Sequence, residues 1–387
     1  MSKKVLFVHD GPIGVYNKNV YGVHYKNELV DRYLIFGKRI SFLMRTTELK
    51  FHDLNKYSLI NREGVRLISI PNFKSFRNLH KKKEAKKTII QAVKEHDVII
   101  VRLPSAAGTI AFKEARRLNK PVLVEFVACV YDALWNYDWR GKLIAEYKLK
   151  LLQKLMLKAT HTIYVTNDFL QNRYPTNGKY IGCSDVELPE INDPKLAERL
   201  SKIKETKTPL KLTTLAAIDV MYKGQADIIN AIAQLRDHNM IFKYDIIGQG
   251  NPDRLQSLID QLNLNDLVKI IGSVPHKEVF DYIENTDVYV QPSKTEGLPR
   301  AVVEAMSLAC PVLGSDVGGI PELIGKEALF EAGNVKDIIK QLSNINNDKL
   351  KKMAIENFNK AKDFKMEALN KKRIQFYNEF KKDYNLS

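Results

Sequence analysis

The sequence predicts an α/β protein with two doubly wound, mostly parallel sheets. The chain has 387 residues, which is more than a single core of typical size holds, so two domains are expected. Short aliphatic runs alternate with segments of helical periodicity in both halves, and this alternation is typical of parallel sheets with helices on their faces. A polar stretch separates the halves, and a new strand follows it. Each half therefore forms its own α/β unit.

The first half alternates strands and helices in the order that a parallel sheet requires. Runs typical of strands occupy residues 4–8, 40–44, 66–70, 98–101, 122–126 and 162–165. Helical periodicity marks residues 24–37, 83–95, 106–118 and 143–157. A glycine-containing loop is expected after the first strand, and the loop VACVYDALWNYDW is expected after the fifth.

The second half repeats the alternation. Its predicted strands are residues 210–215, 242–247, 268–272, 288–290 and 311–314. Its predicted helices are residues 225–236, 252–262, 277–284 and 299–309, with a further helix beginning at Pro321 and a final one at 367–384. The predicted boundaries are a first domain at residues 1–185, a polar linker at 186–208, a second domain at 209–365 and a C-terminal helix at 366–387.

Composition excludes several classes of protein. Apolar residues make up 44% of the chain, which is ordinary for a globular protein. There is no apolar run of about 18 residues, so no transmembrane helix is expected, and the apolar run near the N-terminus is too short for a signal peptide. Cys129, Cys183 and Cys310 are unpatterned, which favours reduced thiols over disulfides or a zinc site. These features predict a cytoplasmic protein.

The net charge of +16 indicates an anionic partner, which would be a nucleic acid, a membrane surface or an anionic substrate. Residues 74–87 carry seven Lys or Arg and one Glu, and residues 140–158 carry six and one, interleaved with Leu, Ile and Met. One interpretation is a solvated helix face whose lysine stems cover apolar surface. The other is an amphipathic surface that rests on the anionic inner leaflet of a membrane.

Residues 287–324 contain the strongest candidate site. They predict strand, loop, helix, strand and loop, with Pro299 in the first helical turn and both loops at the sheet edge where open α/β sheets bind ligands. Glu296 lies in the first loop, and Glu304 follows in the helix. The helix N-terminus favours a phosphate, and carboxylates accept hydrogen bonds from hydroxyls. This combination suits a nucleotide sugar, whereas the alternative is two solvated glutamates.

This stretch resembles the Glu-x7-Glu region of the retaining glycosyltransferases of family 4, the glycosyl transferases group 1. The matching residues are Pro292, Ser293, Glu296, Gly297, Pro299, Glu304, Ala305, Met306, Pro311, Val312, Gly318, Gly319, Pro321 and Glu322. The resemblance implies the GT-B fold, in which two Rossmann-like domains face a central cleft. The first would bind the acceptor and the second the nucleotide sugar, and the C-terminal helix would cross back to the first domain.

The resemblance implies roles for residues of the second domain. Glu296 would hold the sugar hydroxyls, Glu304 the ribose hydroxyls, and Lys223, which Gly224 follows, the diphosphate. The other donor-binding candidates are Gly248, Gly250, Gly272, Ser273, Val274, Ser293, Gly297, Leu298, Pro299 and Arg300. Relatives often have an arginine five residues before the lysine, where this chain has Ile218, and Arg300 is the candidate substitute.

The acceptor side carries fewer matches. Asp132 is the candidate acid or base, although an aspartate there would also serve as a helix N-cap. Trp135 and Asn136 would contact a sugar. Gly11 and Gly14 would border the cleft, or would belong to an ordinary turn between a strand and a helix. Many relatives carry a histidine where this chain has Val127.

The function that the resemblance implies is retaining transfer of a sugar from a nucleotide sugar, a UDP-sugar, to a saccharide acceptor. A lipid-linked acceptor in bacterial surface polysaccharide biosynthesis is expected, on the inner face of the membrane. Neither a cofactor nor a metal is expected, because no Asp-x-Asp motif lies near the donor residues. The alternatives are a nucleotide-sugar epimerase of the same fold and a basic nucleic-acid-binding protein, for which a recognition motif is lacking.

Overall fold

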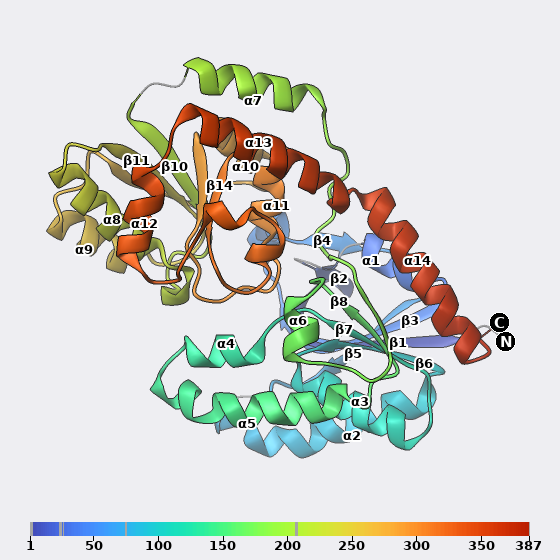
Figure 1. Cartoon of the computed structure of the whole chain (residues 1–387). Coiled ribbons are helices and arrows are strands. Elements are labelled where there is room, and N and C mark those ends of the chain that lie inside the picture. Colours follow the sequence, from blue (N-terminus) through green and yellow to red (C-terminus); the bar gives the residue numbers. More distant parts are fainter. Residues whose placement is uncertain (1–2, 23–24, 26, 74–75, 206–207, 387) are drawn as a thin grey trace.

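The structure is a computed structural model that describes residues 3–22, 25, 27–73, 76–205 and 208–386. It has two α/β domains, each built around its own sheet (Figure 1). The α/β class and the two mostly parallel sheets are as the sequence predicts. The beginning of the expected helix at 24–37 and the residues 74–75 of the first basic segment lie outside the described residues.

The sheet of the first domain has nine strands. They are β1 (Lys4–Tyr16), β2 (Asn19–Gly22), β3 (Arg39–Glu48), β4 (Ser58–Ile60), β5 (Val65–Ile70), β6 (Val98–Leu103), β7 (Val122–Phe126), β8 (His161–Tyr164) and β9 (Lys179–Gly182). Parallel pairing runs from β5 through β3, β1, β6, β7 and β8 to β9. The short strands β2 and β4 add an antiparallel extension beside the end of β1.

The glycine-containing loop predicted after the first strand is wrong, because β1 continues to Tyr16 and forms a hairpin with β2. The strand passes its glycines and proline by a register shift against β3 between Val8 and Pro12. Ile13 is fully buried and holds the extension in the core. The hairpin turns at Asn17 and Lys18, which both have positive φ.

Helices cover both faces of this sheet. They are α1 (Asn27–Tyr33), α2 (Lys82–Glu95), α3 (Ala106–Arg117), α4 (Val130–Trp135), α5 (Trp139–Met156) and α6 (Phe169–Arg173). Successive residues of β1 face opposite sides, as a strand requires. Leu6 and Val8 belong to the core cluster that includes residues of α2, α3 and α5. Val5 and Phe7 belong to the cluster that includes residues of α1.

The second sheet has six strands in the order β12, β11, β10, β13, β14 and β15, all parallel. They are β10 (Leu210–Leu215), β11 (Phe242–Ile247), β12 (Val268–Gly272), β13 (Val288–Gln291), β14 (Val312–Ser315) and β15 (Leu329–Phe330). The helices are α8 (Gln225–Asp237), α9 (Asp253–Gln261), α10 (His276–Glu284), α11 (Arg300–Ser307), α12 (Val335–Ser343) and α13 (Asn347–Ala361). Each predicted strand of this half is present within two residues.

Two expectations in the second half need correction. The polar segment that we interpret as a linker contains helix α7 (Pro194–Glu205), which packs on the second domain. Its Arg199 is buried and donates to the carbonyl oxygens of Thr286 and Ile283. The helix predicted to begin at Pro321 is a single 3₁₀ turn, η4 (Ile320–Glu322), because the chain leaves it for β15.

Helix α14 (Met366–Asp383) completes the core of the first domain although it is last in the chain. Its buried face, with Phe376, Tyr377 and Phe380, belongs to the same cluster as Val5 and Phe7. Figure 1 shows α14 leaving the second domain and running along the first. The chain therefore crosses between the domains twice, once before α7 and once before α14. The two crossing segments are hydrogen-bonded to each other, since the amide of Leu188 donates to the carbonyl oxygen of Phe364.

The buried position of His96 predicts a pH dependence of stability. Its Nδ1 donates to the Ala92 carbonyl oxygen at 2.7 Å, and its Nε2 lies 2.7 Å from Ser41 Oγ. Burial lowers the pKa of His96 below its ordinary value of 6.5. The unfolded chain therefore takes up this proton at a higher pH than the folded chain, so we expect the unfolding free energy to fall as pH drops below about 6.5.

Urea unfolding of the wild type and His96→Gln at about pH 7.5 and about pH 5.5 measures this contribution. The difference between the two proteins isolates His96 from the other titrating groups. We expect the wild type to lose more stability on acidification than the variant does. An equal loss in both would show that His96 does not contribute.

Candidate active site

The predicted donor residues gather at one edge of the second sheet. Parallel strands end at the same edge, and ligands of open α/β sheets bind there. Lys223 follows β10, at the end of the 3₁₀ turn η3 (Met221–Lys223). Gly248 and Gly250 follow β11, Gly272 ends β12, and Ser293 follows β13. Most of the predicted donor-binding residues therefore lie just after the carboxyl ends of four neighbouring strands.

Glu296 and Lys223 form an ion pair at this edge. Lys223 Nζ lies 2.6 Å from Glu296 Oε1, with the lysine side chain 21% exposed and the glutamate side chain 11% exposed. Ser293 Oγ donates to the same carboxylate oxygen at 2.7 Å, and Gln291 Nε2 donates to it at 3.1 Å. One carboxylate oxygen thus receives three donors, which fix the direction of the Glu296 side chain.

A series of buried, hydrogen-bonded side chains leads to Glu296 and holds it in place. Tyr289 OH donates to Gln291 Oε1 at 2.8 Å, and Gln291 Nε2 donates to Ser293 Oγ at 2.9 Å. Tyr289, Gln291 and Ser293 are all buried. Tyr289 and Gln291 are site residues that sequence reasoning missed. The available signal was the two-residue spacing from Tyr289 to Ser293, which places all three on one face of the strand and its continuation.

Glu304 lies beneath the same edge. It is 5% exposed and sits in α11, which follows the Glu296 loop. Both Glu296 and Glu304 are close enough to the Tyr289 hydroxyl to raise its pKa, after burial, which is the largest cause. Both carboxylates therefore lie within electrostatic range of the same hydroxyl. That they bind one ligand stays a prediction.

The glycines of the donor loops allow strands and loops to approach closely. An ideal Cβ on Gly248 would lie 1.8 Å from the Ala216 carbonyl oxygen, and one on Gly250 would lie 2.5 Å from Asp219 Oδ1. Gly272 has φ of +83° with open space around it, and Ser273 after it is exposed. Val274 packs partly against the core of the second domain.

Gly224 connects the lysine turn to the loop that carries Ser293. Its φ is +75°, and an ideal Cβ would lie 1.9 Å from the Pro292 carbonyl oxygen. We expect Gly224→Ala to lower the unfolding free energy more than Gly272→Ala does. Gly272→Ala has the same backbone strain of about 1–2 kcal/mol from its positive φ, but its new Cβ would have no atom within 4 Å to clash with. Urea unfolding of both variants checks this, and equal losses would contradict the close contact.

The residues at the start of α11 face the first domain. An ideal Cβ on Gly297 would lie 2.7 Å from the Val127 carbonyl oxygen. Leu298 packs against the cores of both domains. Pro299 is the N-cap and not part of the first turn, so α11 begins one residue later than predicted, at Arg300, which is exposed. Gly297 and Leu298 therefore join the domains at the donor loop.

The first domain contributes α4 and the segment after it. Asp132 pairs with Arg173, with Nη1 and Oδ1 3.2 Å apart, and Cys129 is the N-cap that the alternative interpretation gave to Asp132. Trp135 is 42% exposed, and its ring stacks on that of Tyr131. Asn136 Nδ2 donates to the Lys294 carbonyl oxygen at 3.1 Å, so the predicted acceptor segment touches the donor loop.

Gly11 and Gly14 lie in different surroundings. The Gly11 amide donates to His9 Nδ1 at 2.9 Å, and Tyr25 OH lies 2.6 Å from the same nitrogen. An ideal Cβ on Gly14 would lie 2.4 Å from Leu49 Cδ1, so Gly14 packs inside the β1 extension. Both glycines therefore belong to β1 and not to a loop, although their neighbours differ.

Glu322 provides an interdomain contact that sequence reasoning did not assign. Its carboxylate accepts from the amides of Asn167, Asp168 and Phe169 at 2.6, 3.1 and 2.8 Å. These amides lie at the start of α6 in the first domain. The motif match already contained Glu322, but only the domain arrangement shows its partners. Arg254 Nη2 donates to the Ile218 carbonyl oxygen at 3.4 Å, so a cation does lie beside the position where relatives have arginine.

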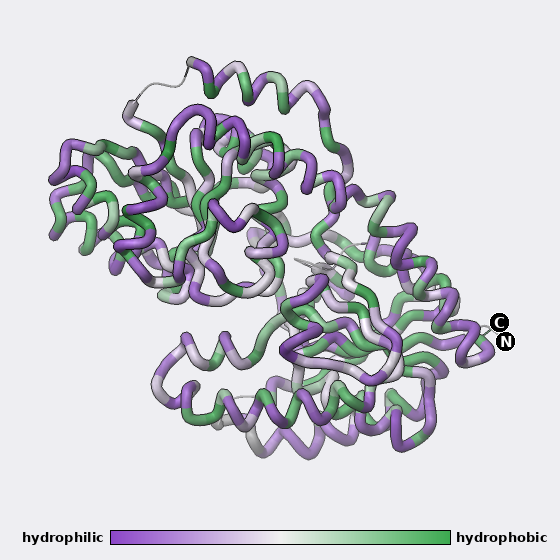
Figure 2. The backbone as a smooth tube through the Cα atoms, in the orientation of Figure 1, coloured by the Kyte–Doolittle hydropathy of each residue, from purple (hydrophilic) through white to green (hydrophobic). Residues whose placement is uncertain are grey.

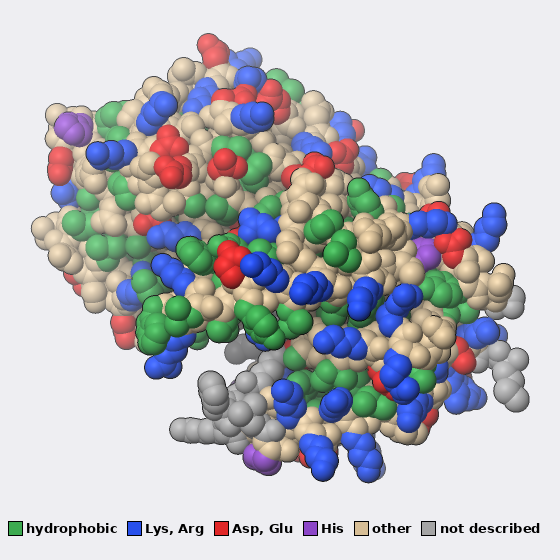
Figure 3. Space-filling view, turned by 60° about the horizontal axis from the view of Figure 1, so that its bottom comes forward, with side chains coloured by type: hydrophobic (Ala, Val, Ile, Leu, Met, Phe, Trp, Pro, Cys, Tyr) green, Lys and Arg blue, Asp and Glu red, His purple; other side chains and the backbone are tan. Residues whose placement is uncertain are grey.

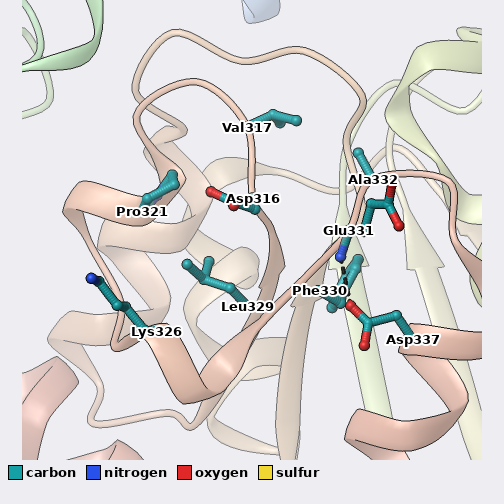
Figure 4. Close-up of a pocket in the computed structure, with 9 residues that line it drawn as sticks. All are labelled: Asp316, Val317, Pro321, Lys326, Leu329, Phe330, Glu331, Ala332 and Asp337. Carbon is teal, nitrogen blue, oxygen red and sulfur yellow. Dashed lines mark hydrogen bonds between the residues drawn. The ribbon is translucent and has the colours of Figure 1, made fainter.

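A cavity of about 710 Å³ opens beside β14 and β15 (Figure 4). Its lining is Asp316, Val317, Pro321, Lys326, Leu329, Phe330, Glu331, Ala332 and Asp337. The cavity shares the sheet edge with the donor loops but contains none of the predicted donor residues. Within the described part of the chain, no group of three or more His, Cys, Asp or Glu could hold a metal ion.

Comparisons with known proteins agree with this geometry. The family model described as "Glycosyl transferases group 1" matches residues 197–362. Protein CapJ of Staphylococcus aureus is 30% identical over 380 residues, which cover 97% of this chain and 92% of CapJ. The chain belongs to the group 1 glycosyltransferases. A putative colanic acid biosynthesis glycosyltransferase of Escherichia coli, WcaL, is 36% identical to this glycosyltransferase over 129 residues, 32% of each chain.

Solved structures show the fold of this glycosyltransferase. HepE of Anabaena in complex with UDP and glucose has a TM-score of 0.67 at 16% identity and covers 97% of this chain and 99% of its own. The sucrose-phosphate synthase of Thermosynechococcus elongatus also gives a TM-score of 0.67 at 16% identity, with 97% and 98% covered. The fold is therefore GT-B, as the resemblance predicts. Whether the individual site residues act as predicted stays a prediction.

Proposed function

We propose that this glycosyltransferase transfers a sugar from a UDP-sugar to a saccharide acceptor, with retention of the anomeric configuration. The observation that carries the proposal is the Lys223–Glu296 pair at the carboxyl edge of the second sheet, held by Ser293 and the buried Gln291. A UDP-sugar is proposed because HepE, which shares the fold, was solved with UDP and UDP-glucose.

In the proposed reaction Lys223 and Glu296 contact different parts of the donor. Breaking the bond at the anomeric carbon leaves negative charge on the diphosphate, which Lys223 and loop amides would stabilise. The sugar hydroxyls would donate to Glu296. A bound donor would therefore replace the direct ion pair, with its phosphate on the lysine and its hydroxyls on the carboxylate. Glu304 would hold the ribose, and no metal is expected to take part.

For the acceptor side we propose a lipid-linked saccharide in bacterial surface polysaccharide biosynthesis. WcaL and an amylovoran biosynthesis glycosyltransferase of Erwinia amylovora, whose names refer to colanic acid and amylovoran biosynthesis, support the polysaccharide part of this proposal. The enzyme would then work in the cytoplasm, peripherally at the inner face of the membrane. Among the described residues, no helix has the length and apolar character needed to cross a bilayer. The net charge of +16 favours an anionic surface.

Thermal unfolding with a panel of UDP, GDP and ADP sugars tests the donor. A ligand at 100 times its Kd adds about 2.7 kcal/mol, so the true donor is expected to raise Tm measurably. Product analysis after incubation with the donor alone separates transfer from epimerisation, since an epimerase converts its donor without acceptor. If none of the nucleotide sugars raises Tm, the donor proposal is wrong.

A further inference from the structure

Large apolar side chains are exposed on one segment of the first domain far more than elsewhere. The described chain has sixteen such side chains, and eight of them lie between residues 135 and 157. They are Trp135, Tyr137, Trp139, Leu143, Ile144, Tyr147, Leu151 and Leu157. This segment consists of the end of α4, the loop after it, α5 and the residue that follows α5 (Figure 1).

The most exposed of these side chains form a stripe along α5. Trp139, Leu143 and Tyr147 are 67%, 72% and 65% exposed. Their spacing of four residues places them on one side of the helix. The buried residues Ala145 and Leu152 lie on the other side. The stripe is therefore the outward face of α5 and not the edge of a core, and nothing in the described chain covers it.

Most charged side chains of α5 are basic, and two of them lie on the same face as the stripe. Helix α5 and the two residues after it carry Arg140, Lys142, Lys148, Lys150, Lys154 and Lys158 against the single acid Glu146. By helical position, Lys150 and Lys154 lie between Trp139 and Tyr147 around the helix. Figure 2 shows hydrophilic and hydrophobic residues alternating along α5. Figure 3, which turns the bottom of Figure 1 toward the viewer, shows Lys and Arg side chains among apolar ones.

This surface is continuous with the active site. Asn136, which lies between the exposed Trp135 and Tyr137, donates to the carbonyl oxygen of Lys294. Lys294 directly follows the buried Ser293 that donates to Glu296. A membrane that contacted α5 would therefore lie next to the contact between the end of α4 and the donor loop.

We propose that the stripe of Trp139, Leu143 and Tyr147, here called the α5 ridge, inserts into the interface of an anionic lipid bilayer. Aromatic and aliphatic side chains enter the headgroup boundary, while neighbouring lysines pair with anionic lipids. A second copy of the chain is disfavoured as occupant, because two surfaces of the same positive charge repel each other. The inference deepens the proposed function, since it names the surface that holds the enzyme beside a lipid-linked acceptor.

Tryptophan fluorescence tests the proposal without a label. The chain has two tryptophans, Trp135 and Trp139, and both lie on this segment. Vesicles of phosphatidylglycerol are expected to shift the emission to shorter wavelength, and brominated acyl chains in those vesicles are expected to quench it. Vesicles of phosphatidylcholine alone should do neither. An unchanged spectrum with excess phosphatidylglycerol at low salt would overturn the proposal.

Matched triple variants distinguish vesicle binding through the α5 ridge from nonspecific binding through any exposed apolar side chain. Trp139→Ala, Leu143→Ala and Tyr147→Ala together are expected to lower the vesicle partition coefficient about 100-fold in co-sedimentation. The control combines Phe51→Ala, Ile355→Ala and Ile374→Ala, which are also exposed but lie on other elements. Equal binding by the two triple variants would contradict the ridge.

The same samples distinguish this inference from the donor proposal. The rise of Tm with UDP should be unchanged in the ridge variant, because its residues lie outside the donor loops. Loss of vesicle binding with an intact UDP response therefore supports the ridge. Vesicle binding by a wild type that ignores every nucleotide would refute the donor proposal and leave the ridge supported.

Discussion

Replacing Lys223 with alanine is expected to lower turnover by about 10²–10³-fold, which is the usual loss when one preorganised donor to a developing charge is removed. The structure adds a second reason for a large effect. Lys223 lies 2.6 Å from Glu296, so its removal leaves a carboxylate without its ion-pair partner where the donor diphosphate is expected. Repulsion between the two anions should weaken donor binding as well as turnover. Steady-state assays with the donor identified by thermal unfolding measure both quantities.

A double variant decides what the lysine does. If Lys223 serves only to neutralise Glu296, then Lys223→Ala combined with Glu296→Gln should recover most of the donor affinity. If it also holds the diphosphate, the double variant should stay impaired. Lys243→Ala, on the exposed part of β11, is the matched control and should behave like the wild type. Wild-type turnover by Lys223→Ala would remove the lysine from the mechanism.

Replacing Arg373 with alanine is expected to cause the largest loss of stability, about 3 kcal/mol, because it breaks a buried charge pair. Arg373 is 3% exposed, and its Nη1 lies 2.8 Å from Glu187 Oε1. Its Nη2 donates to the Ser184 carbonyl oxygen at 2.8 Å. Arg32 also reaches Glu187, at 2.5 Å, so the carboxylate keeps one partner and the loss stays at the lower end of the usual range.

Arg373 joins α14 to the segment where the chain leaves the first domain, so the loss should be visible in the unfolding of that domain. Tm should fall by roughly 6–12 °C, since 1 kcal/mol corresponds to about 2–4 °C for a domain of 150–250 residues. Differential scanning calorimetry checks the value. Lys372→Ala, one position earlier and exposed, is the control. If both variants melt at the same temperature, the buried pair does not stabilise the packing of α14 on the first domain.

The second sheet was predictable from the sequence because its strands are buried on both faces. Such strands appear as continuous apolar runs bounded by turn residues, and Val288–Gln291 is an example in which every residue is buried. The site glycines were predictable for a related reason, since Gly224 and Gly318 have positive φ that few other residues adopt.

Other elements were not predictable by the same means. Gly11, Pro12 and Gly14 indicate a loop by residue type, but the buried Ile13 keeps the chain in the sheet. Helix α7 has a polar composition typical of a linker, although Leu196, Leu200 and Ile203 follow helical spacing and would have revealed its packed face. Tertiary packing overrode local composition in both cases.

The contacts within the site depend on the order of strands, which the sequence does not state. Lys223 and Glu296 meet because β10 and β13 are neighbours in the sheet although three helices and two strands separate them along the chain. The pairing of Asp132 with Arg173 likewise needs α4 and α6 to be adjacent. Residue types at the site were therefore predictable, whereas their partners were not.

Calorimetric titration of UDP into the wild type and into Glu304→Gln tests the donor site most directly. Glu304 is 5% exposed beneath the edge that carries Lys223 and Glu296, and the substitution keeps its shape while removing the carboxylate. We predict one UDP site in the wild type and at least about tenfold weaker binding in the variant, which corresponds to about 1.4 kcal/mol. Equal affinity of the two proteins, or no binding of UDP to the folded wild type, would contradict a nucleotide-sugar site at this edge.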